Sequence, residues 1–188
     1  MSEILLGLDR VACLRGGRLL FEGLSISLAP GEAAIVAGPN GAGKSSLLRI
    51  AAGLLRPSAG MVTRNGAAGL ADERMALDER QTLGAAMRFW TRLDGVRSET
   101  GMDAMGLSHL AKVPLRMLST GQRKRAAIAR VVASGARLWL LDEPANGLDS
   151  DGLARLGEVM TRHRVRGGAV LAATHQPIGL ADAAEVRL

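Results

Sequence analysis

A glycine-rich segment that ends in a lysine and a serine is the part of this chain best suited to bind phosphate. Residues 38–45 read GPNGAGKS and fit the pattern G-x-x-x-x-G-K-[ST] at every fixed position. The glycines allow a tight turn that directs successive backbone N–H groups inward at an anion. In this motif the lysine, here Lys44, reaches the β- and γ-phosphates, and the hydroxyl of Ser45 binds Mg²⁺. The residues predicted to bind a nucleoside triphosphate are Gly38, Pro39, Asn40, Gly41, Ala42, Gly43, Lys44, Ser45 and Ser46.

An aspartate and a glutamate side by side could supply the second metal ligand and the base that a phosphate loop needs. Residues 138–142 are an apolar run that ends in Asp142, and Glu143 follows directly. In open α/β sheets, ligands bind at the carboxyl ends of the strands. We predict that Asp142 binds Mg²⁺ and that Glu143 polarises a water toward the γ-phosphate. A solvated strand end is the alternative, and the phosphate loop in the same chain favours the catalytic interpretation.

Alternating strands and helices are expected to position these residues. Residues 33–37 have the length of a buried strand, and residues 46–52 space apolar residues as a helix does, up to a stop at Gly53. The phosphate-binding motif requires a strand before the glycine loop and a helix after it, and both are predicted here. This context argues against the alternative interpretation, a glycine-rich turn that binds nothing. Further helices are predicted at residues 121–134 and 151–163, and further buried strands at residues 137–142 and 169–174. This order predicts an α/β fold with a mostly parallel sheet and helices on both faces.

The N-terminal region is predicted to be an antiparallel β part. Residues 4–8 and 11–14 read as two strands, a turn follows at residues 15–18, and residues 24–28 alternate apolar and polar residues as a half-buried strand does. Further on, residues 61–63 and the turn Asn65-Gly66 predict a short hairpin at the edge of a sheet.

A small helical lobe is predicted between the phosphate loop and the second half of the chain. Residues 71–80 are charged and loop-like, and the following segment to residue 118 is mostly helical. Helix breaks are expected at Gly95, Gly101, Gly106 and Pro114, and Ser108 is expected to cap a helix. The 188 residues then form one domain, with a core of residues 1–73 and 119–188 and a lobe of residues 74–118.

The charge, the cysteine content and the apolar runs of the chain argue against several classes of function. The net charge of +6 comes almost entirely from arginines that are scattered among acidic residues, so we expect no direct binding to nucleic acid. The single cysteine, Cys13, permits no intramolecular disulfide and suits a reducing compartment. The N-terminus does not resemble a signal peptide, and no apolar run of about 18 residues is present. We therefore expect any membrane association to go through a partner.

Several further motifs resemble those of the ATP-binding-cassette (ABC) ATPases and occur in the order that is typical of that family. The segment LSTGQ at residues 118–122 resembles the LSGGQ signature, and the helix after it continues with Arg125, Ala129 and Arg130 as the family pattern does. Residues 140–144 resemble the Walker B strand, residues 145–149 the D-loop, and residues 173–175 the segment that ends in the switch histidine. The motifs cover nearly the whole chain.

The resemblance implies a mechanism in which ATP pairs two cassettes head to tail. The signature of one copy would complete the nucleotide site of the other, through Ser119, Thr120, Gly121 and Gln122. Glu143 would be the general base, and His175 would contact the γ-phosphate. A helix N-terminus directed at phosphate is a favourable anion site, which fits the signature's position at the start of a helix. An alternative is a binding module that uses ATP only to dimerise. The presence of Glu143 and His175 argues against that alternative.

Residues 15–21, 87–90 and 174–177, together with Thr120, carry a narrower resemblance. They resemble the ATP-binding subunits of the haem exporter of cytochrome c maturation, the CcmA family. The resemblance implies integral membrane partners, a peripheral position on the cytoplasmic face of the inner membrane, and ATP hydrolysis that releases a haem-loaded periplasmic chaperone. No haem is expected on this chain, which lacks a C-x-x-C-H pattern. Another ABC importer or exporter, or a soluble ABC ATPase of nucleic-acid metabolism, is the alternative.

Two positions depart from the ABC pattern, and one pair of aromatic residues has two possible roles. The aromatic residue that stacks on adenine is missing, and Arg15 stands at about its position, where a guanidinium could stack on the base. The family's Q-loop glutamine aligns with Glu73. Phe89 and Trp90 would belong either to a groove for the membrane partner or to the packing of the lobe.

Overall fold

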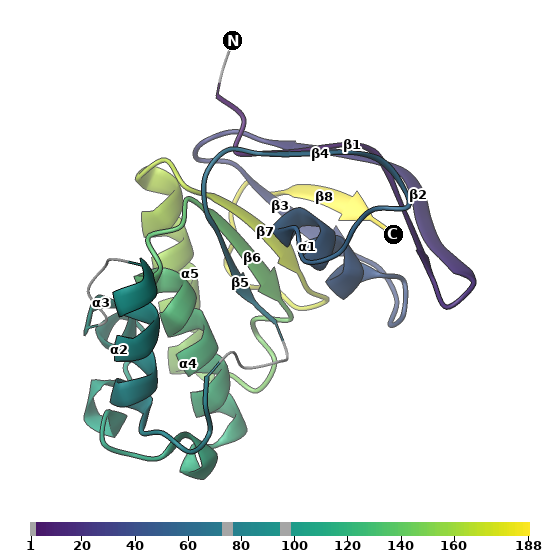
Figure 1. Cartoon of the computed structure of the whole chain (residues 1–188). Helices are drawn as coiled ribbons and strands as arrows, with labels where there is room; N and C mark the ends of the chain where they lie inside the picture. The colour runs from purple at the N-terminus through teal and green to yellow at the C-terminus, as the bar shows by residue number, and fades with distance from the viewer. Residues whose placement is uncertain (1–2, 73–76, 95–98) are drawn as a thin grey trace.

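Two β-sheets with helices between and beside them make up the computed structural model, which describes residues 3–72, 77–94 and 99–188 (Figure 1). The larger sheet has five strands in the order β5 (Ala68–Ala71), β6 (Leu138–Asp142), β7 (Ala169–Ala173), β3 (Ala33–Ala37) and β8 (Ala184–Arg187). All of its neighbouring strands run parallel. β6 and β7 are buried along their whole length, as the central strands of a sheet covered on both faces must be. The predicted parallel α/β core is confirmed.

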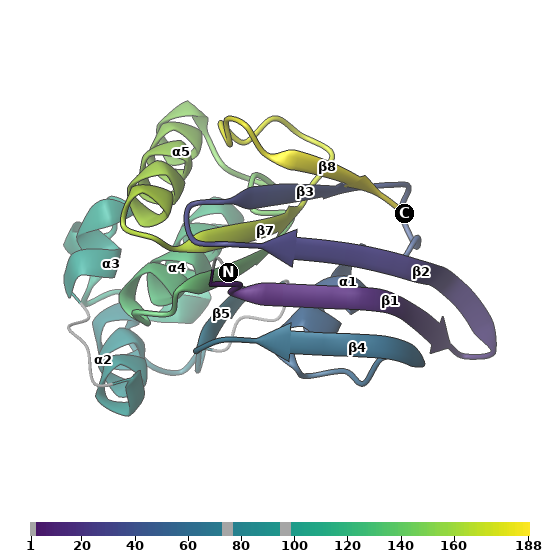
Figure 2. The ribbon, with the colours of Figure 1, turned by 90° about the horizontal axis from the view of Figure 1, so that it is seen from above.

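A three-stranded antiparallel sheet covers one side of this core (Figure 2). Its order is β2 (Arg18–Leu28), β1 (Leu6–Arg15) and β4 (Ala59–Arg64). Helix α1 (Lys44–Ala52) lies between the two sheets, and Gly53 ends it in a left-handed conformation with φ of 78°. One apolar cluster joins this helix to both sheets; its buried members include Leu6, Leu8, Ile26, Leu47, Leu48, Leu138, Leu140 and Leu171. The core therefore holds the helix of the phosphate loop from two sides.

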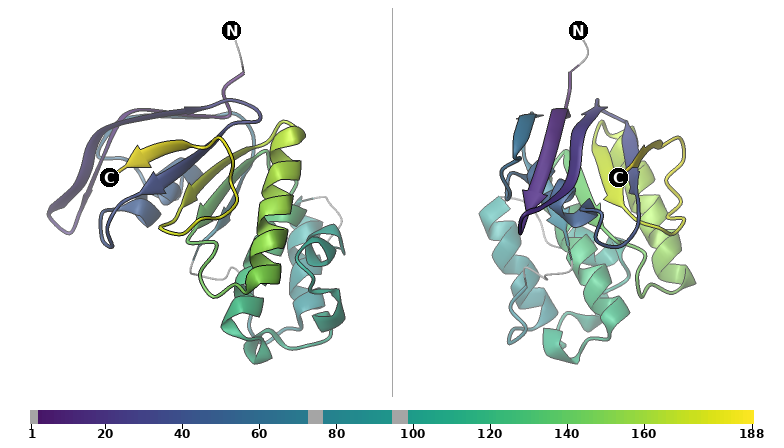
Figure 3. Two further views of the ribbon diagram at one scale, coloured as in Figure 1. Left: turned by 180° about the vertical axis from the view of Figure 1, so that it is seen from behind. Right: turned by 90° about the vertical axis from the view of Figure 1, so that its right-hand side faces the viewer.

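The other face of the parallel sheet is covered by α4 (Thr120–Ala133) and α5 (Ser150–Val165), as Figure 3 shows from behind. Along β6 the side chains alternate between the two faces. Leu138 and Leu140 join the cluster around α1, whereas Trp139 and Leu141 pack in the second cluster, with α4 and α5. The predicted arrangement with helices on both faces is confirmed.

The segment before α4 folds into a helical lobe that packs against α4 (Figure 1). It contains α2 (Leu83–Asp94), α3 (Glu99–Ala104) and two 3₁₀ turns, η1 (Ser108–Leu110) and η2 (Leu115–Met117). Its buried apolar residues belong to the same cluster as α4 and the parallel sheet, for example Leu83, Met87, Met105 and Leu115. Among the described residues, no helix has the length and apolar character needed to cross a membrane.

Two details predicted for the lobe are wrong. Gly101 does not break a helix but lies inside α3, where a side chain would collide with the backbone carbonyl of Ala129 on α4. The glycine is needed for close packing of two helices. Ser108 does not cap a helix; it begins η1, and its hydroxyl donates to Asp103. The break predicted at Gly95 lies outside the described residues.

The two strands predicted at residues 4–8 and 11–14 are one strand, β1. The pairing with β2 shifts register between Leu8 and Val11, where Arg10 takes a positive φ of 46°. Such a bulge lets one strand continue past an irregular residue. The predicted turn is confirmed, since Gly16 and Gly17 both have positive φ and join β1 to β2.

The hairpin predicted around Asn65-Gly66 is also wrong. β4 pairs with β1, and the chain then crosses to β5 in the other sheet. The Asn65 side chain donates to the carbonyl of Ile4 at 2.6 Å, and its backbone N–H donates to that of Leu5 at 3.1 Å. These bonds hold the connection against the start of β1 instead of folding it into a hairpin.

Candidate functional site

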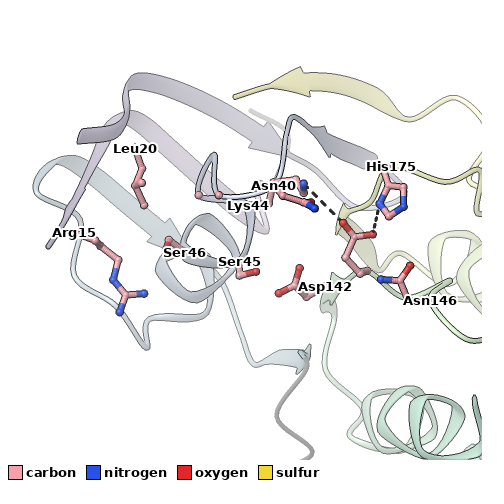
Figure 4. Close-up of a pocket in the computed structure, with 12 residues that line it drawn as sticks. Arg15, Leu20, Asn40, Lys44, Ser45, Ser46, Asp142, Asn146 and His175 are labelled. Carbon is pink, nitrogen blue, oxygen red and sulfur yellow. Dashed lines mark ion pairs between the residues drawn. The ribbon is translucent and has the colours of Figure 1, made fainter. Parts of the chain in front are cut away.

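A cleft of about 500 Å³ opens where the carboxyl ends of β3 and β6 meet the N-terminus of α1 (Figure 4). Most of the residues singled out from the sequence come together here, although they are spread over more than 150 positions of the chain. The cleft is lined by Arg15, Leu20, Asn40, Gly41, Gly43, Lys44, Ser45, Ser46, Asp142, Glu143, Asn146 and His175.

The glycine loop is shaped by close contacts as well as by its own flexibility. Gly43 precedes α1 with φ of 107°, a conformation that side chains disfavour. A Cβ atom there would lie 3.0 Å from the ring of Phe21 and 3.1 Å from the Cβ atom of Leu20. The strand β2 therefore lies close against the loop, and a side chain at residue 43 would need a shift of this strand as well as an unfavourable backbone conformation. The first turn of α1, with N–H groups that no helical carbonyl can satisfy, faces the cleft.

Lys44 is the cation at the centre of the loop. Its Nζ donates to the carbonyl oxygens of Gly38 at 2.8 Å and Pro39 at 3.3 Å. The same atom lies 3.8 Å from Oε1 of Glu143, and the lysine side chain is 8% exposed. A buried ammonium held by backbone carbonyls is well placed to meet the negative charge of a phosphate.

Glu143 occupies an unusual position directly after β6. Its φ is 43°, which is rare for a residue with a side chain and is typical of strained functional positions. Its N–H donates to the carbonyl of Ala173 at 2.8 Å, so the backbone is tied to the end of β7. Its Oε2 is buried, and Nδ1 of His175 lies 3.0 Å away without the alignment of a hydrogen bond. A buried carboxylate oxygen without a hydrogen bond is costly, and it is suited to accept a proton from a bound molecule.

Ser45 and Asp142 supply oxygen atoms to the same cleft. The Asp142 side chain is buried at the end of β6, and its carbonyl accepts from Lys124 Nζ at 2.6 Å. In the described parts of the chain, no three His, Cys, Asp or Glu residues gather as a metal cage. A hydroxyl and one carboxylate suit Mg²⁺, which takes few protein ligands and completes its shell with waters and phosphate oxygens.

The signature residues lie outside this cleft, at the start of α4. Ser119 and Gln122 form a capping box: the Gln122 N–H donates to Ser119 Oγ at 3.2 Å, and the Ser119 N–H donates to Gln122 Oε1 at 2.9 Å. Thr120 and Gly121 form the first turn between them. Gly121 packs directly on the backbone of Gly147, in the loop that follows Glu143. The cap thus fixes the direction of the helix start.

Of the remaining residues predicted for the nucleotide site, all but one lie at the cleft or in the phosphate loop. Gly38 and Pro39 act through their carbonyls, and Ala42 donates its N–H to Pro39 at 3.2 Å within the loop. Arg15 lines the cleft at the end of β1. Glu73 lies outside the described residues.

Leu20 and Asn146 line the cleft but were not predicted. Leu20 follows the turn after Arg15, so pairing of the two strands could have placed it there. Asn146 stands three residues after Glu143 and accepts from Gln176 Nε2 at 3.4 Å. Its place within the D-loop motif was the only signal in the sequence.

Comparison with known proteins agrees with this geometry. Residues 21–146 match the family model described as ABC transporter. The structure described as the ATP binding subunit of an ABC transporter superposes with a TM-score of 0.83 over 91% of this chain and 79% of that one, at 23% identity. The chain therefore belongs to the ABC transporter family, as one of its ATPase subunits.

A narrower family follows from closer relatives. The cytochrome c biogenesis ATP-binding export protein CcmA of Sphingopyxis alaskensis is 55% identical over 97% of this chain and 96% of its own length. CcmA of Novosphingobium aromaticivorans is 55% identical over 96% of this chain and 93% of its own. The chain belongs to the CcmA family. As an ABC transporter ATPase it binds ATP, couples hydrolysis to transport and works with membrane subunits.

Proposed function

We propose that this chain is the ATP-hydrolysing subunit of an export complex in cytochrome c biogenesis, and that its hydrolysis energises haem export or the release of a haem-loaded chaperone. The observation that carries the proposal is the meeting of Lys44, Glu143 and His175 in one cleft, in a chain whose relatives are named for this process. Haem itself is handled by the partners and not by this chain.

The phosphate loop holds the triphosphate. Lys44 exchanges its carbonyl partners for the β- and γ-phosphate oxygens, and the N–H groups of the loop and of the first turn of α1 complete the cradle. Asn40 and Gly41 line the cleft beside them. Because Lys44 is buried, its attraction for phosphate is weakly screened by solvent.

Ser45 and Asp142 would hold Mg²⁺ through the serine hydroxyl and the aspartate carboxylate. When bound, the ion would neutralise negative charge that develops on the phosphates. Asp142 is kept in place by its burial at the end of β6 and by the bond from Lys124 to its carbonyl.

Glu143 acts as the general base of hydrolysis. Its buried Oε2 accepts the proton of the water that attacks the γ-phosphorus, and the left-handed backbone directs the carboxylate into the cleft. His175, 3.0 Å away and more than half exposed, contacts the γ-phosphate from the open side and helps to orient Glu143. Replacing His175 by Ala should lower the hydrolysis rate at least about tenfold and should change ATP affinity much less, which phosphate-release and ATP-binding assays would measure.

Two copies form the complete site. The signature residues Ser119 to Gln122 do not line their own cleft, and their helix begins with a rigid cap. In a head-to-tail dimer Ser119 and the N–H of Gly121 face the γ-phosphate bound to the partner copy. ATP then joins the two copies, and hydrolysis separates them.

The single domain comprises a core of residues 1–73 and 119–188 and a lobe of residues 74–118, and the lobe contacts the integral membrane subunits. Trp90 packs against the core cluster, with the Cζ atom of Arg130 5.0 Å from its ring centroid. Phe89, 5.8 Å from Trp90 between ring centroids, is 54% exposed. Trp90 thus serves packing, and Phe89 is available to the membrane partner. The chain is peripheral, on the cytoplasmic face of the inner membrane.

Co-purification from membranes, combined with ATP binding, tests this function. The tagged chain should bring down integral haem-handling subunits, and Phe89→Ala should weaken that association while leaving ATP affinity unchanged. Lys44→Ala should abolish tight ATP binding. Recovery of transporter subunits unrelated to haem would assign the chain to another ABC system. A hydrolysis rate stimulated by nucleic acid, with no membrane partner, would contradict the proposal.

A further inference from the structure

The peptide unit that joins Asp142 to Glu143 is held at both of its polar atoms. Its carbonyl, on Asp142, accepts a hydrogen bond from Nζ of Lys124 at 2.6 Å, and its N–H, on Glu143, donates to the carbonyl of Ala173 at 2.8 Å. Lys124 lies on α4 and Ala173 ends β7, so the two partners come from different elements. The orientation of this peptide unit is therefore set from both sides.

That orientation decides how the backbone presents the proposed base. Glu143 has φ of 43°, and a residue with a side chain keeps such a conformation only where its surroundings impose it. Rotation of the peptide unit changes ψ of Asp142 and φ of Glu143 together, and a half-turn would give Glu143 an ordinary negative φ. The same rotation would break both hydrogen bonds, because it exchanges the places of the carbonyl and the N–H. The two bonds thus oppose the backbone relaxation that would redirect the Glu143 carboxylate.

The bond from Lys124 is the one of the two that a side chain supplies. An ammonium group that donates to a carbonyl makes a charge-assisted hydrogen bond, which is shorter and stronger than a bond between neutral groups. Lys124 is also partly buried, so water competes less for its ammonium group than at an exposed position. Lys124 is therefore well suited to hold this peptide unit in place.

Neighbouring cations on α4 are used differently. Arg123 donates to the carbonyl of Arg116 in the lobe at 2.7 Å, and Arg125 lies 3.5 Å from Asp151 on α5. Lys124 stands between them in the sequence and reaches the end of β6. A bond between a helix and a strand end could serve stability alone, but its acceptor here belongs to the residue directly before the proposed base. This placement favours a role in hydrolysis.

We propose that Lys124 is a positioning residue for hydrolysis: through the carbonyl of Asp142 it holds Glu143 in the left-handed conformation that directs its carboxylate to the attacking water. The inference rests on the proposed function of Glu143 as the general base. Lys124 itself moves no proton and contacts no reacting atom. Because it lies on α4 directly after the signature residues, the helix that meets the partner copy's nucleotide also holds the base of its own copy.

Phosphate release and ATP binding by Lys124→Met test the inference on the full chain. Methionine keeps the length of the side chain and the helix propensity, and it removes the donor. We expect kcat to fall about 10- to 100-fold, because a displaced base no longer meets the water in the productive geometry. The dissociation constant of ATP with Mg²⁺ should stay within about threefold of wild type, since the lost interaction matters only in the transition state.

Two further variants control for charge and for folding. Lys124→Arg keeps a charged donor and should recover most of the lost rate. Lys112→Met makes the same change at an exposed lysine of the lobe and should leave kcat and ATP affinity unchanged. If Lys124→Met does not fold, Lys124→Gln, with a shorter and uncharged side chain, replaces it with the same expectations. A wild-type kcat for the Lys124 variant, or a loss of ATP affinity as large as the loss of kcat, would overturn the inference.

A double-mutant cycle separates positioning of Glu143 from other roles of Lys124. In the Glu143→Gln background no base remains to be positioned, so adding Lys124→Met should change the residual rate by less than about twofold. A further loss as large as in the wild-type background would show that Lys124 acts elsewhere, for example on the proposed Mg²⁺ ligand Asp142, and would overturn the inference. Slow hydrolysis by Glu143→Gln with a wild-type rate for Lys124→Met overturns the inference alone. A wild-type rate for Glu143→Gln overturns the proposed role of Glu143 as well.

Discussion

The carbonyl oxygen of Gly147 lies in the space that a side chain on Gly121 would occupy. Gly121 is in the first turn of α4, and Gly147 belongs to the loop that follows Glu143. Gly147 itself has φ of 76°, so both sides of the contact depend on glycine. The backbone at the start of α4 therefore packs directly against the backbone of the loop that follows Glu143.

Gly121→Ala should destabilise the protein by about 1–3 kcal/mol, because a methyl group would force two backbone segments apart. ATP hydrolysis should fall at least tenfold if this contact aligns the signature. Gly157→Ala, inside α5, is the matched control, since its methyl group would meet only Ile178 O at 3.9 Å. That substitution should raise the free energy of unfolding by about 0.5–1 kcal/mol. Urea denaturation measures the free energy of unfolding of both variants. Equal effects of the two substitutions would refute the steric explanation.

Arg130 links the helical lobe to the parallel sheet. It donates to the carbonyl of Leu70 on β5, and its guanidinium lies over the Trp90 ring of α2. Burial lowers the pKa of Arg130, and the nearby Asp94 and Asp72 oppose that effect. Arg130→Ala should lower the free energy of unfolding by about 2–4 kcal/mol, because buried partners lose a charged donor.

Arg162→Ala serves as the control for this change. Arg162 is 58% exposed on α5, with Glu158 at 4.0 Å, so its loss should cost less than about 0.5 kcal/mol. Chemical denaturation of both variants should show the difference. Equal stability of the two would mean that Arg130 does not join the lobe to the core.

His163 should make stability depend on pH. Its ring stacks on Trp139, and its Nε2 lies 3.0 Å from the carbonyl of Arg137. Burial lowers the pKa of His163 below its ordinary value of 6.5, and backbone hydrogen bonds partly offset this. The unfolded chain therefore binds this proton more readily than the folded chain, so stability falls as pH drops below 6.5 and is unaffected by this group at higher pH.

His163→Phe keeps a ring on Trp139 and removes the titration. The stability difference between wild type and variant, measured by denaturation from pH 8 to pH 5, should shrink as pH falls. A difference that stays constant over this range would contradict the lowered pKa of His163.

The local parts of the fold were predictable from the sequence, because short segments determine them. The phosphate loop, the buried runs of β6 and β7, and the helix after Gly121 each carry their pattern within a few residues. The partner of β4 was not predictable, because β4 pairs with a strand far away in the sequence, for example Arg64 with Leu6. The short edge strand β8, which is mostly exposed, has no apolar run to mark it.

The site was predictable to the extent that its residues belong to motifs. Lys44, Asp142, Glu143 and His175 meet in one cleft as their motifs imply. Leu20 was missed because an aliphatic residue in a strand carries no chemical signal, and only the pairing of β1 with β2 brings it there. The left-handed conformation of Glu143 was equally invisible, since it follows from how the end of β6 is tied to Ala173.

The role of Glu143 is the central claim, and phosphate release by Glu143→Gln tests it most directly. Glutamine keeps the size of the side chain and cannot accept the proton, so we expect hydrolysis to fall at least about 100-fold. ATP affinity should stay within about threefold of wild type, and an ATP-bound dimer should accumulate. Glu158→Gln, 71% exposed on α5 and outside the cleft, should hydrolyse ATP at the wild-type rate. Phosphate release by Glu143→Gln at the wild-type rate would contradict the claim.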